Sequence, residues 1–195
     1  MSVSIEEIKK LKELSGVGLT DAKKALVEAN GDFDKALEAM RKKGLTKAEK
    51  RGDRETREGL VEAYIHDGRL GAIVEVNCET SFVAKTDEFK DLAHKIAMQI
   101  ASMSPLYVSE DDIPEDVMKA KKKELEANFK GPKDKKDMIL EGQIKKAFAD
   151  KILLNQPYIL DDTKTVADFI KDNIAKTGEN ISVRQFKRIE LGVTE

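Results

Sequence analysis

The histidine and cysteine side chains that most often serve as nucleophiles, bases or zinc ligands are few in this chain, and they are scattered. The chain has two histidines, His66 and His94, and one cysteine, Cys78. A zinc site needs about four ligands, and a nucleophile needs a neighbouring base, so this set favours neither. The Gly-Val-Gly at 16–18 lacks the preceding strand and the Gly-Lys-Ser/Thr ending of a phosphate-binding loop. The sequence therefore favours a binding module over an enzyme, with no metal and no cofactor.

Composition and charge narrow the function classes further. The 195 residues are 40% hydrophobic and 37% charged, and 35 Lys and Arg against 37 Asp and Glu give a net charge of −2. This balance disfavours a dedicated nucleic-acid binder, because phosphate recognition depends on excess positive charge. The N-terminus has neither a signal-peptide nor a transit-peptide pattern, and no apolar run approaches the roughly 20 residues of a membrane span. One cysteine fits a reducing compartment, so we expect a cytoplasmic protein.

The first 44 residues predict a small module of three short helices, because apolar residues recur at helical spacing. The expected N-caps are Ser4, with Glu7 completing a capping box, then Thr20 or Asp21, then Asp32. The expected helix ends are Gly16 with Gly18, Asn30-Gly31, and Gly44 in a left-handed cap. Residues 45–58 are charged and lack strong periodicity, so they predict a partly helical linker.

Residues 59–195 predict an α+β core domain. Two β-rich runs flank Asp67-Gly68, a strong hairpin-turn signal, and the alternating run 181–191 predicts another strand. Amphipathic helices are expected between them: a long one ended by Ser104-Pro105, a charged protruding stretch over about 110–155 interrupted at Gly131-Pro132, and a last one capped by Thr165 with Asp168 and ended by Gly178. QPYIL predicts a short extended piece. The fold class is an antiparallel sheet packed with helices.

Three stretches of the chain resemble the elongation factor Ts family. KKLKELSGVGLTDAKKAL with EANGDFDKALEAMRKKG resembles its N-terminal three-helix module of the ubiquitin-associated type. EVNCETSFVAKTDEF resembles its most specific motif, and KTVADFIKDNIAKTGENISVRQFKRIELG resembles its closing helix and strand. Together they cover nearly the whole chain in the family's order. The resemblance implies a guanine nucleotide exchange factor that binds elongation factor Tu in its GDP and nucleotide-free forms.

The same resemblance implies which residues contact the partner. The motif positions are Thr80, Ser81, Phe82 and Val83, with Phe82 as an apolar wedge that disturbs the Mg²⁺ and phosphate site. Candidate contacts attributed to the N-terminal module are Lys9, Lys12, Leu19, Thr20 and Lys23, with Arg51 in the linker. From spacing alone Phe82 would be a core residue, Leu19 a cover for the module's own core, and the basic residues ordinary solvated charges.

Two departures from the family pattern affect these expectations. Ser81 stands where the family usually has an acidic residue, so a carboxylate role cannot be transferred to this position. The chain also has one copy of the core module where longer members have two, and the resemblance implies that such short forms are homodimers. A single small sheet with one helical face leaves apolar surface to cover, which agrees with a dimer.

Three alternative functions remain open from the sequence. The N-terminal module alone would suit an adaptor that binds a helical peptide or ubiquitin-like partner. Cys78 could serve as an enzyme nucleophile, although a lone cysteine is more often a small buried hydrophobe. The basic linker could bind RNA, which low ionic strength would reveal.

Overall fold

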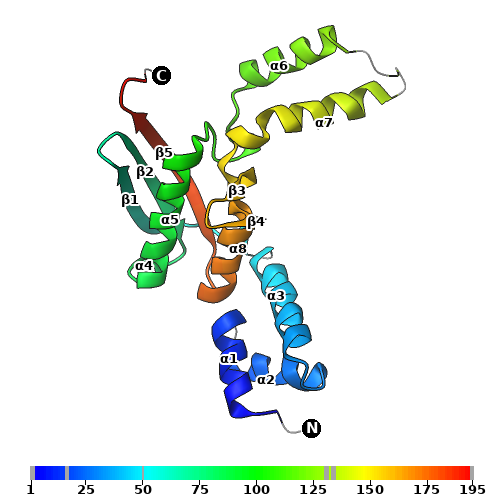
Figure 1. Ribbon diagram of the computed structural model, residues 1–195, viewed down its shortest axis with the longest axis vertical. Helices are drawn as coiled ribbons and strands as arrows, with labels where there is room; N and C mark the ends of the chain where they lie inside the picture. The colour runs from blue at the N-terminus through cyan, green and yellow to red at the C-terminus, as the bar shows by residue number, and fades with distance from the viewer. Residues whose placement is uncertain (1–2, 16–17, 50, 130–131, 133–134, 194–195) are drawn as a thin grey trace. The chain divides into compact units, whose positions relative to one another are not determined.

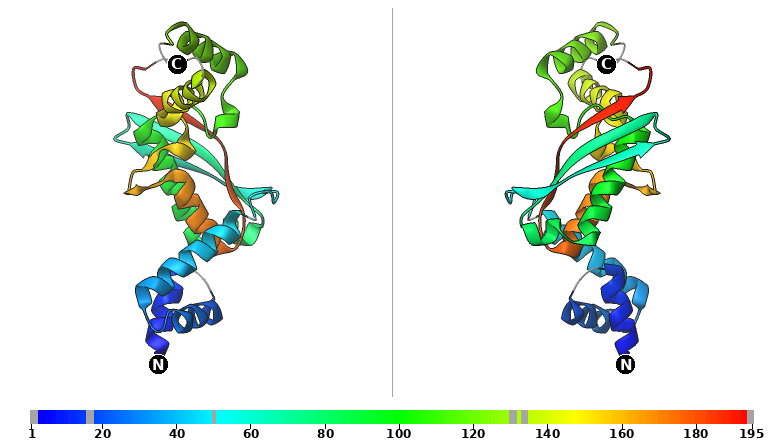
Figure 2. Two further views of the ribbon diagram at one scale, coloured as in Figure 1. Left: turned by 90° about the vertical axis from the view of Figure 1, so that its right-hand side faces the viewer. Right: turned by 90° about the vertical axis from the view of Figure 1, so that its left-hand side faces the viewer.

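The structure is a computed structural model that describes residues 3–15, 18–49, 51–129, 132 and 135–193. It divides into two compact units, one comprising Met1–Glu62, Glu75–Ala93 and Asp168–Val183, and the other comprising Ala63–Val74, His94–Ala167 and Arg184–Glu195. The division runs across the strands, so both units contain part of the sheet. Figures 1 and 2 show the helices and strands.

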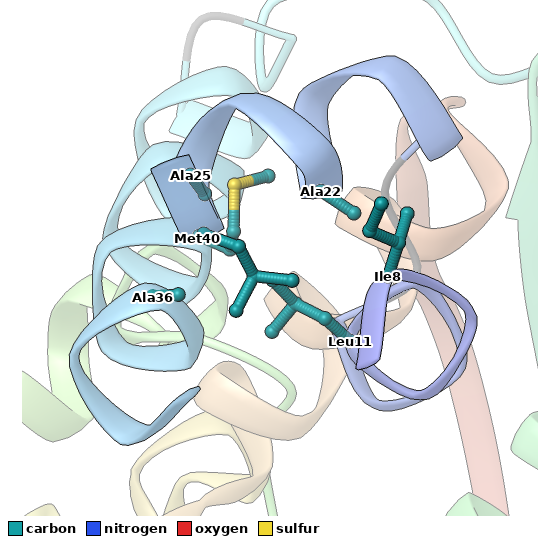
Figure 3. Packing of buried hydrophobic residues seen from close by; sticks show 7 residues of the cluster. Ile8, Leu11, Ala22, Ala25, Ala36 and Met40 are labelled. Atoms are coloured by element: carbon teal, nitrogen blue, oxygen red, sulfur yellow. The ribbon is translucent and has the colours of Figure 1, made fainter. Parts of the chain in front are cut away.

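The N-terminal helices are α1 (Ile5–Ser15), α2 (Leu19–Glu28) and α3 (Phe33–Glu49). Their apolar faces meet in one small core, shown in Figure 3 and formed by Ile8, Leu11, Ala22, Ala25, Leu26, Ala36 and Met40. The capping box of α1 is confirmed, since the Glu7 backbone N–H donates to Ser4 Oγ and the Ser4 N–H donates to the Glu7 carboxylate. The cap of α3 is also confirmed, because Asp32 Oδ1 accepts from the Lys35 N–H at 3.1 Å.

Two helix boundaries differ from the sequence prediction. Neither Thr20 nor Asp21 caps α2, because both lie inside the helix, which begins at Leu19 with Gly18 as an N-cap that has no side chain to accept a hydrogen bond. Gly44 does not end α3, which continues to Glu49. A mid-helix glycine costs only about 1 kcal/mol, and the good helix formers after it extend the helix. Gly16 and Gly131 lie outside the described residues.

The sheet has the order β1-β2-β5 and is formed by β1 (Glu58–His66), β2 (Leu70–Cys78) and β5 (Ile181–Glu190). The predicted hairpin turn is confirmed, since Asp67 and Gly68 both have positive φ, 49° and 65°, as a tight hairpin turn requires. The Leu191 N–H donates to the Arg69 carbonyl, so the end of β5 meets the start of β2 and the strands are antiparallel. The α+β fold class is therefore confirmed; the resemblance of the N-terminal module to a ubiquitin-associated domain stays a prediction.

Helix α5 (Asp87–Met103) supplies much of the apolar packing beside the sheet. Every residue assigned to its inner face is buried: Phe89, Leu92, Ala93, Ile96, Ala97 and Ile100. Its C-terminal half contacts the sheet, since the Tyr64 ring lies edge-on to His94 and Arg188 Nε donates to the Ala101 carbonyl at 3.0 Å. The helix ends before Ser104, which has a φ of 48°, as predicted.

The segment predicted to protrude forms a helical hairpin of α6 (Glu115–Ala127) and α7 (Lys136–Phe148), which lie side by side (Figures 1 and 2). Four short elements adjoin the hairpin: η1 (Glu110–Asp112), η3 (Ala149–Lys151), η4 (Leu153–Asn155) and β3 (Pro157–Tyr158). β3 pairs with β4 (Asp161–Thr165), a strand that the sequence analysis missed. Buried Gln99 fixes this region, because its side-chain carbonyl accepts from the Ile159 N–H and its amide donates to the Pro157 carbonyl.

Helix α8 (Val166–Thr177) begins directly after Thr165, as the sequence predicts, and ends at Gly178. The φ of Gly178 is 77°, and its N–H donates to the Ile174 carbonyl at 2.9 Å. This left-handed residue turns the chain into β5. The boundaries predicted for the domains, 1–44, 45–58 and 59–195, stay predictions.

Candidate partner-binding site

Phe82 is the most exposed large apolar side chain of the motif region. It lies on α4 (Ser81–Ala84), a four-residue helix between β2 and α5, and 84% of its surface is accessible. A phenylalanine this exposed contributes almost nothing to a core, so the core position expected from spacing alone is wrong. The ring is therefore available to contact another protein.

The start of α4 is held by a carboxylate from a distant part of the chain. Glu179, between α8 and β5, accepts two hydrogen bonds from Thr80: one from the backbone N–H at 2.9 Å and one from the hydroxyl at 2.6 Å. Thr80 is the N-cap residue of α4, but its hydroxyl makes no cap hydrogen bond to the helix. The hydroxyl is instead used to bind Glu179.

A second carboxylate makes the reciprocal connection. Glu79 Oε1 accepts from the Asn180 backbone N–H at 2.6 Å, and its Oε2 accepts from Arg54 at 3.2 Å. The Asn180 side chain in turn donates to the carbonyls of Gly52 and Arg54. The hydrogen bond from the Asn180 N–H is the main reason that the pKa of Glu79 lies below its usual range. The hydrogen bond and charge of Arg54 lower it further.

Thr86 closes the other end of α4. Its hydroxyl donates to the Val83 carbonyl at 2.8 Å and accepts from the Phe89 N–H, so it links α4 to the first turn of α5. Val83 and Ser81 are half-buried, and Ala84 is buried. The four motif residues therefore lie together at one corner of the fold, with Phe82 pointing furthest into solvent.

The candidates on α1 and α2 are all exposed. Leu19 is 52% accessible, so part of its side chain is open to a partner, and whether it also covers the core of its own module stays a prediction. Lys9 and Lys12 are three residues apart on α1, and Thr20 and Lys23 are three apart on α2, so each pair shares one helix face. Their exposure is compatible with contact to a partner, and their role stays a prediction.

Arg51 lies near the corner that carries the motif. Its guanidinium nitrogens are 3.8 and 3.9 Å from where a β-carbon on Gly178 would stand, and its charge contributes to lowering the pKa of Glu79. Arg51 is half-buried. Arg51 therefore lies beside Gly178, at the junction between α8 and β5.

The groups considered for catalysis are not arranged for it. Cys78 is fully buried, and burial raises the pKa of its thiol, with the charge of Glu179 adding to the effect. A raised pKa opposes formation of the nucleophilic thiolate. His66 accepts or donates a hydrogen bond with Tyr64, and His94 packs edge-on against the same ring. Within the described residues, no group of three His, Cys, Asp or Glu side chains is placed to hold a metal ion, and no helix is long and apolar enough to cross a membrane.

Comparison with known proteins identifies the family. The family model described as elongation factor TS matches residues 5–193. The chain is 50% identical over 194 residues to elongation factor Ts of Thermotoga maritima, covering 98% of both chains. It is 46% identical to that of Fervidobacterium nodosum and 48% identical to that of Moorella thermoacetica, again over nearly the whole of each protein. The chain belongs to the elongation factor Ts family. Its role is therefore in translation elongation.

Membership of the elongation factor Ts family confirms the resemblance seen in the sequence. Sequence reasoning nevertheless missed Glu79, Glu179, Asn180 and Arg54, which hold the motif in place. Glu79 directly precedes Thr80, but Glu179 is 99 residues away, and no local pattern connects the two. Only the pairing of β2 with β5 brings these two chain segments together.

Proposed function

We propose that this protein is a non-enzymatic guanine nucleotide exchange factor for elongation factor Tu. It binds the GDP form, promotes GDP release and GTP loading, and acts in the cytoplasm without nucleic acid or cofactor of its own. The observation that carries the proposal is the 84% exposed Phe82, at the wedge position of the family's motif, on a helix braced at both ends. An exposed ring on a braced support suits insertion into a partner.

Exchange follows from differential binding. A factor that binds the nucleotide-free partner more tightly than the GDP-bound one weakens nucleotide binding by the same ratio. Burying one phenylalanine is worth about 1.5–3 kcal/mol, which corresponds to about one to two decades of affinity. Larger acceleration needs further contacts. The exposed Lys9, Lys12, Leu19, Thr20 and Lys23 of the N-terminal module, with Arg51, are our candidates for these.

The replacement of the usual acidic motif residue by Ser81 changes what this position contributes. A serine here supplies a neutral hydroxyl where a carboxylate would supply a charge. We propose that Ser81 contacts the partner through hydrogen bonding alone and that Val83, half-buried, supports the Phe82 ring.

The test is release of fluorescent GDP from elongation factor Tu, followed by stopped flow after adding this protein and excess unlabelled nucleotide. Catalytic amounts of the protein should accelerate release, and Phe82→Ala should lower the exchange efficiency by about tenfold or more. Leu160→Ala removes another exposed apolar side chain, 57% accessible, from the β3–β4 turn and serves as the control. Absence of acceleration by the wild-type protein refutes the exchange function, and binding without acceleration would support the adaptor alternative.

We also propose that the protein is a homodimer joined through the outer face of the sheet. Four side chains from the three strands form an exposed apolar patch: Ile65, Ile73, Ile189 and, just after β5, Leu191. Ile65 and Ile189 are 72% and 75% accessible. Together with Ala63, Gly71 and neighbouring residues they line a shallow, mostly apolar groove. A second copy provides the same patch, and a two-fold axis covers both at once.

A further inference from the structure

The β2–α4 junction and the α8–β5 junction are joined by a reciprocal pair of carboxylates. Glu179 accepts from the backbone N–H of Thr80, and Glu79 accepts from the backbone N–H of Asn180. Each acidic residue directly precedes the residue whose N–H the other one binds. The two junctions therefore hold each other in register by hydrogen bonds to charged groups, which are stronger than those between neutral groups.

Helix α4 needs such support because it is too short to be stable alone. A helix of four residues has no complete internal hydrogen-bond ladder, and its formation depends on tertiary contacts. Inside the segment, Cys78 Sγ donates to the Thr80 carbonyl at 3.2 Å, and the Ala84 N–H donates to the same carbonyl at 3.3 Å. Thr80 is thus held at its carbonyl by local groups, and at its N–H and hydroxyl by Glu179.

We propose that Glu179 is a positioning residue for nucleotide exchange, acting through Thr80 to fix the direction in which Phe82 points. This inference rests on the proposed exchange function. Phe82 is two residues after Thr80, so rotation of the Thr80 backbone would swing the ring. A ring already held in its binding orientation loses less conformational entropy on binding than a mobile one. Glu179 thereby raises the fraction of encounters in which the wedge enters its site.

The conservative variant separates this role from a direct contact of the Glu179 charge with the partner. In Glu179→Gln, the amide carbonyl can still accept from the Thr80 N–H, and its NH₂ can donate to the Thr80 hydroxyl, which both accepts and donates. Both hydrogen bonds survive although the charge is gone. Glu179→Ala loses both. We expect kcat/KM for GDP release to fall about five- to tenfold in Glu179→Ala and less than threefold in Glu179→Gln.

A second background tests whether Glu179 acts through Phe82. If it does, Glu179→Ala should have little further effect once Phe82→Ala is present, because the ring it positions is gone. Glu124→Ala, which removes a carboxylate bound to Lys121 on α6, is the matched control and should leave exchange unchanged in both backgrounds.

A readout without elongation factor Tu keeps this inference separate from the exchange function. The chain has no tryptophan, so Phe82→Trp introduces one indole at the wedge position, which can be excited at wavelengths where the three tyrosines do not absorb. Its fluorescence anisotropy should fall when Glu179→Ala is added and be retained with Glu179→Gln, while the circular dichroism spectrum stays that of the folded protein.

Unchanged anisotropy in Glu179→Ala overturns the proposal. So does an equal loss of exchange in Gln and Ala variants, or an equal loss with and without Phe82. Failure of the wild type to accelerate release, with the anisotropy result as expected, refutes the exchange function alone.

Discussion

At the scale of single residues, the hydrogen bonds around the motif include the carboxylate of Glu79. Glu79 is half-buried and accepts from the Asn180 N–H and from Arg54, and these donors favour its charged form. The ordinary pKa of glutamate is about 4.3, and that of Glu79 is lower when the protein is folded. Between these two values the unfolded chain binds more protons than the folded chain, so stability rises with pH.

Glu79→Gln should therefore change the acid sensitivity of the protein. The stabilisation from the Glu79 charge is complete above about pH 4.3 and is lost as the pH falls through the lowered folded pKa. We expect the melting temperature of the wild type to fall more steeply than that of Glu79→Gln below about pH 4.5, with the variant already less stable at pH 7. Thermal unfolding followed by circular dichroism across this range is the measurement. Parallel pH profiles for the two proteins would contradict the assignment.

At the scale of elements, β1 lies so close to β2 that one position accepts only glycine. Gly59 has a φ of +152°, and a β-carbon there would stand 2.2 Å from the Val76 carbonyl oxygen and 2.7 Å from the Asn77 Cα. Both atoms belong to the backbone, which cannot move aside without disturbing the strand pairing. The glycine is therefore required by the sheet itself.

Gly59→Ala should destabilise the protein by about 2–3 kcal/mol or more, since it combines a strained φ with a backbone collision. For a chain of this size that corresponds to a fall in melting temperature of roughly 5–10 °C. Gly142→Ala is the control: apart from the adjoining backbone of α7 itself, no atom of the described residues lies within 4 Å of the added β-carbon, so replacing this helical glycine should stabilise by about 0.5–1 kcal/mol. Similar melting temperatures for the two variants would contradict the requirement for glycine at position 59.

At the scale of the whole molecule, the proposed homodimer uses the apolar outer face of the sheet, and a charge placed on that face tests it. Ile65→Lys places a charge in the groove on β1, and in a two-fold dimer each such charge occurs twice in one interface. We expect sedimentation equilibrium to report a dimer for the wild type and a monomer for Ile65→Lys, with unchanged helix content. Met138→Lys, at an exposed position of α7, should remain a dimer. A monomeric wild type, or a dimeric Ile65→Lys, would show that this face is not the interface.

Much of the fold was predictable from local sequence because its signals are short-range. The Ser4–Glu7 capping box, the Asp67-Gly68 turn and the inner face of α5 each depend on residues a few positions apart. The prediction was wrong where the residues that follow a local stop signal favour continuing the helix. Gly44 is an ordinary helix stop, but the helix formers that follow it carry α3 on to Glu49. Strand β4, with the sequence DDTKT, is too short and too polar to give a strand pattern.

The sequence by itself determined the family, the motif Thr80–Val83 and the expectation of an antiparallel sheet with helices. Only the tertiary structure decided that Phe82 is exposed, because apolar spacing does not distinguish a core residue from one held in solvent. It also paired Glu79 with Asn180 and Glu179 with Thr80. Those contacts join segments about a hundred residues apart in the sequence. Such hydrogen bonds can form only after β2 and β5 have paired, because the pairing brings the two segments together.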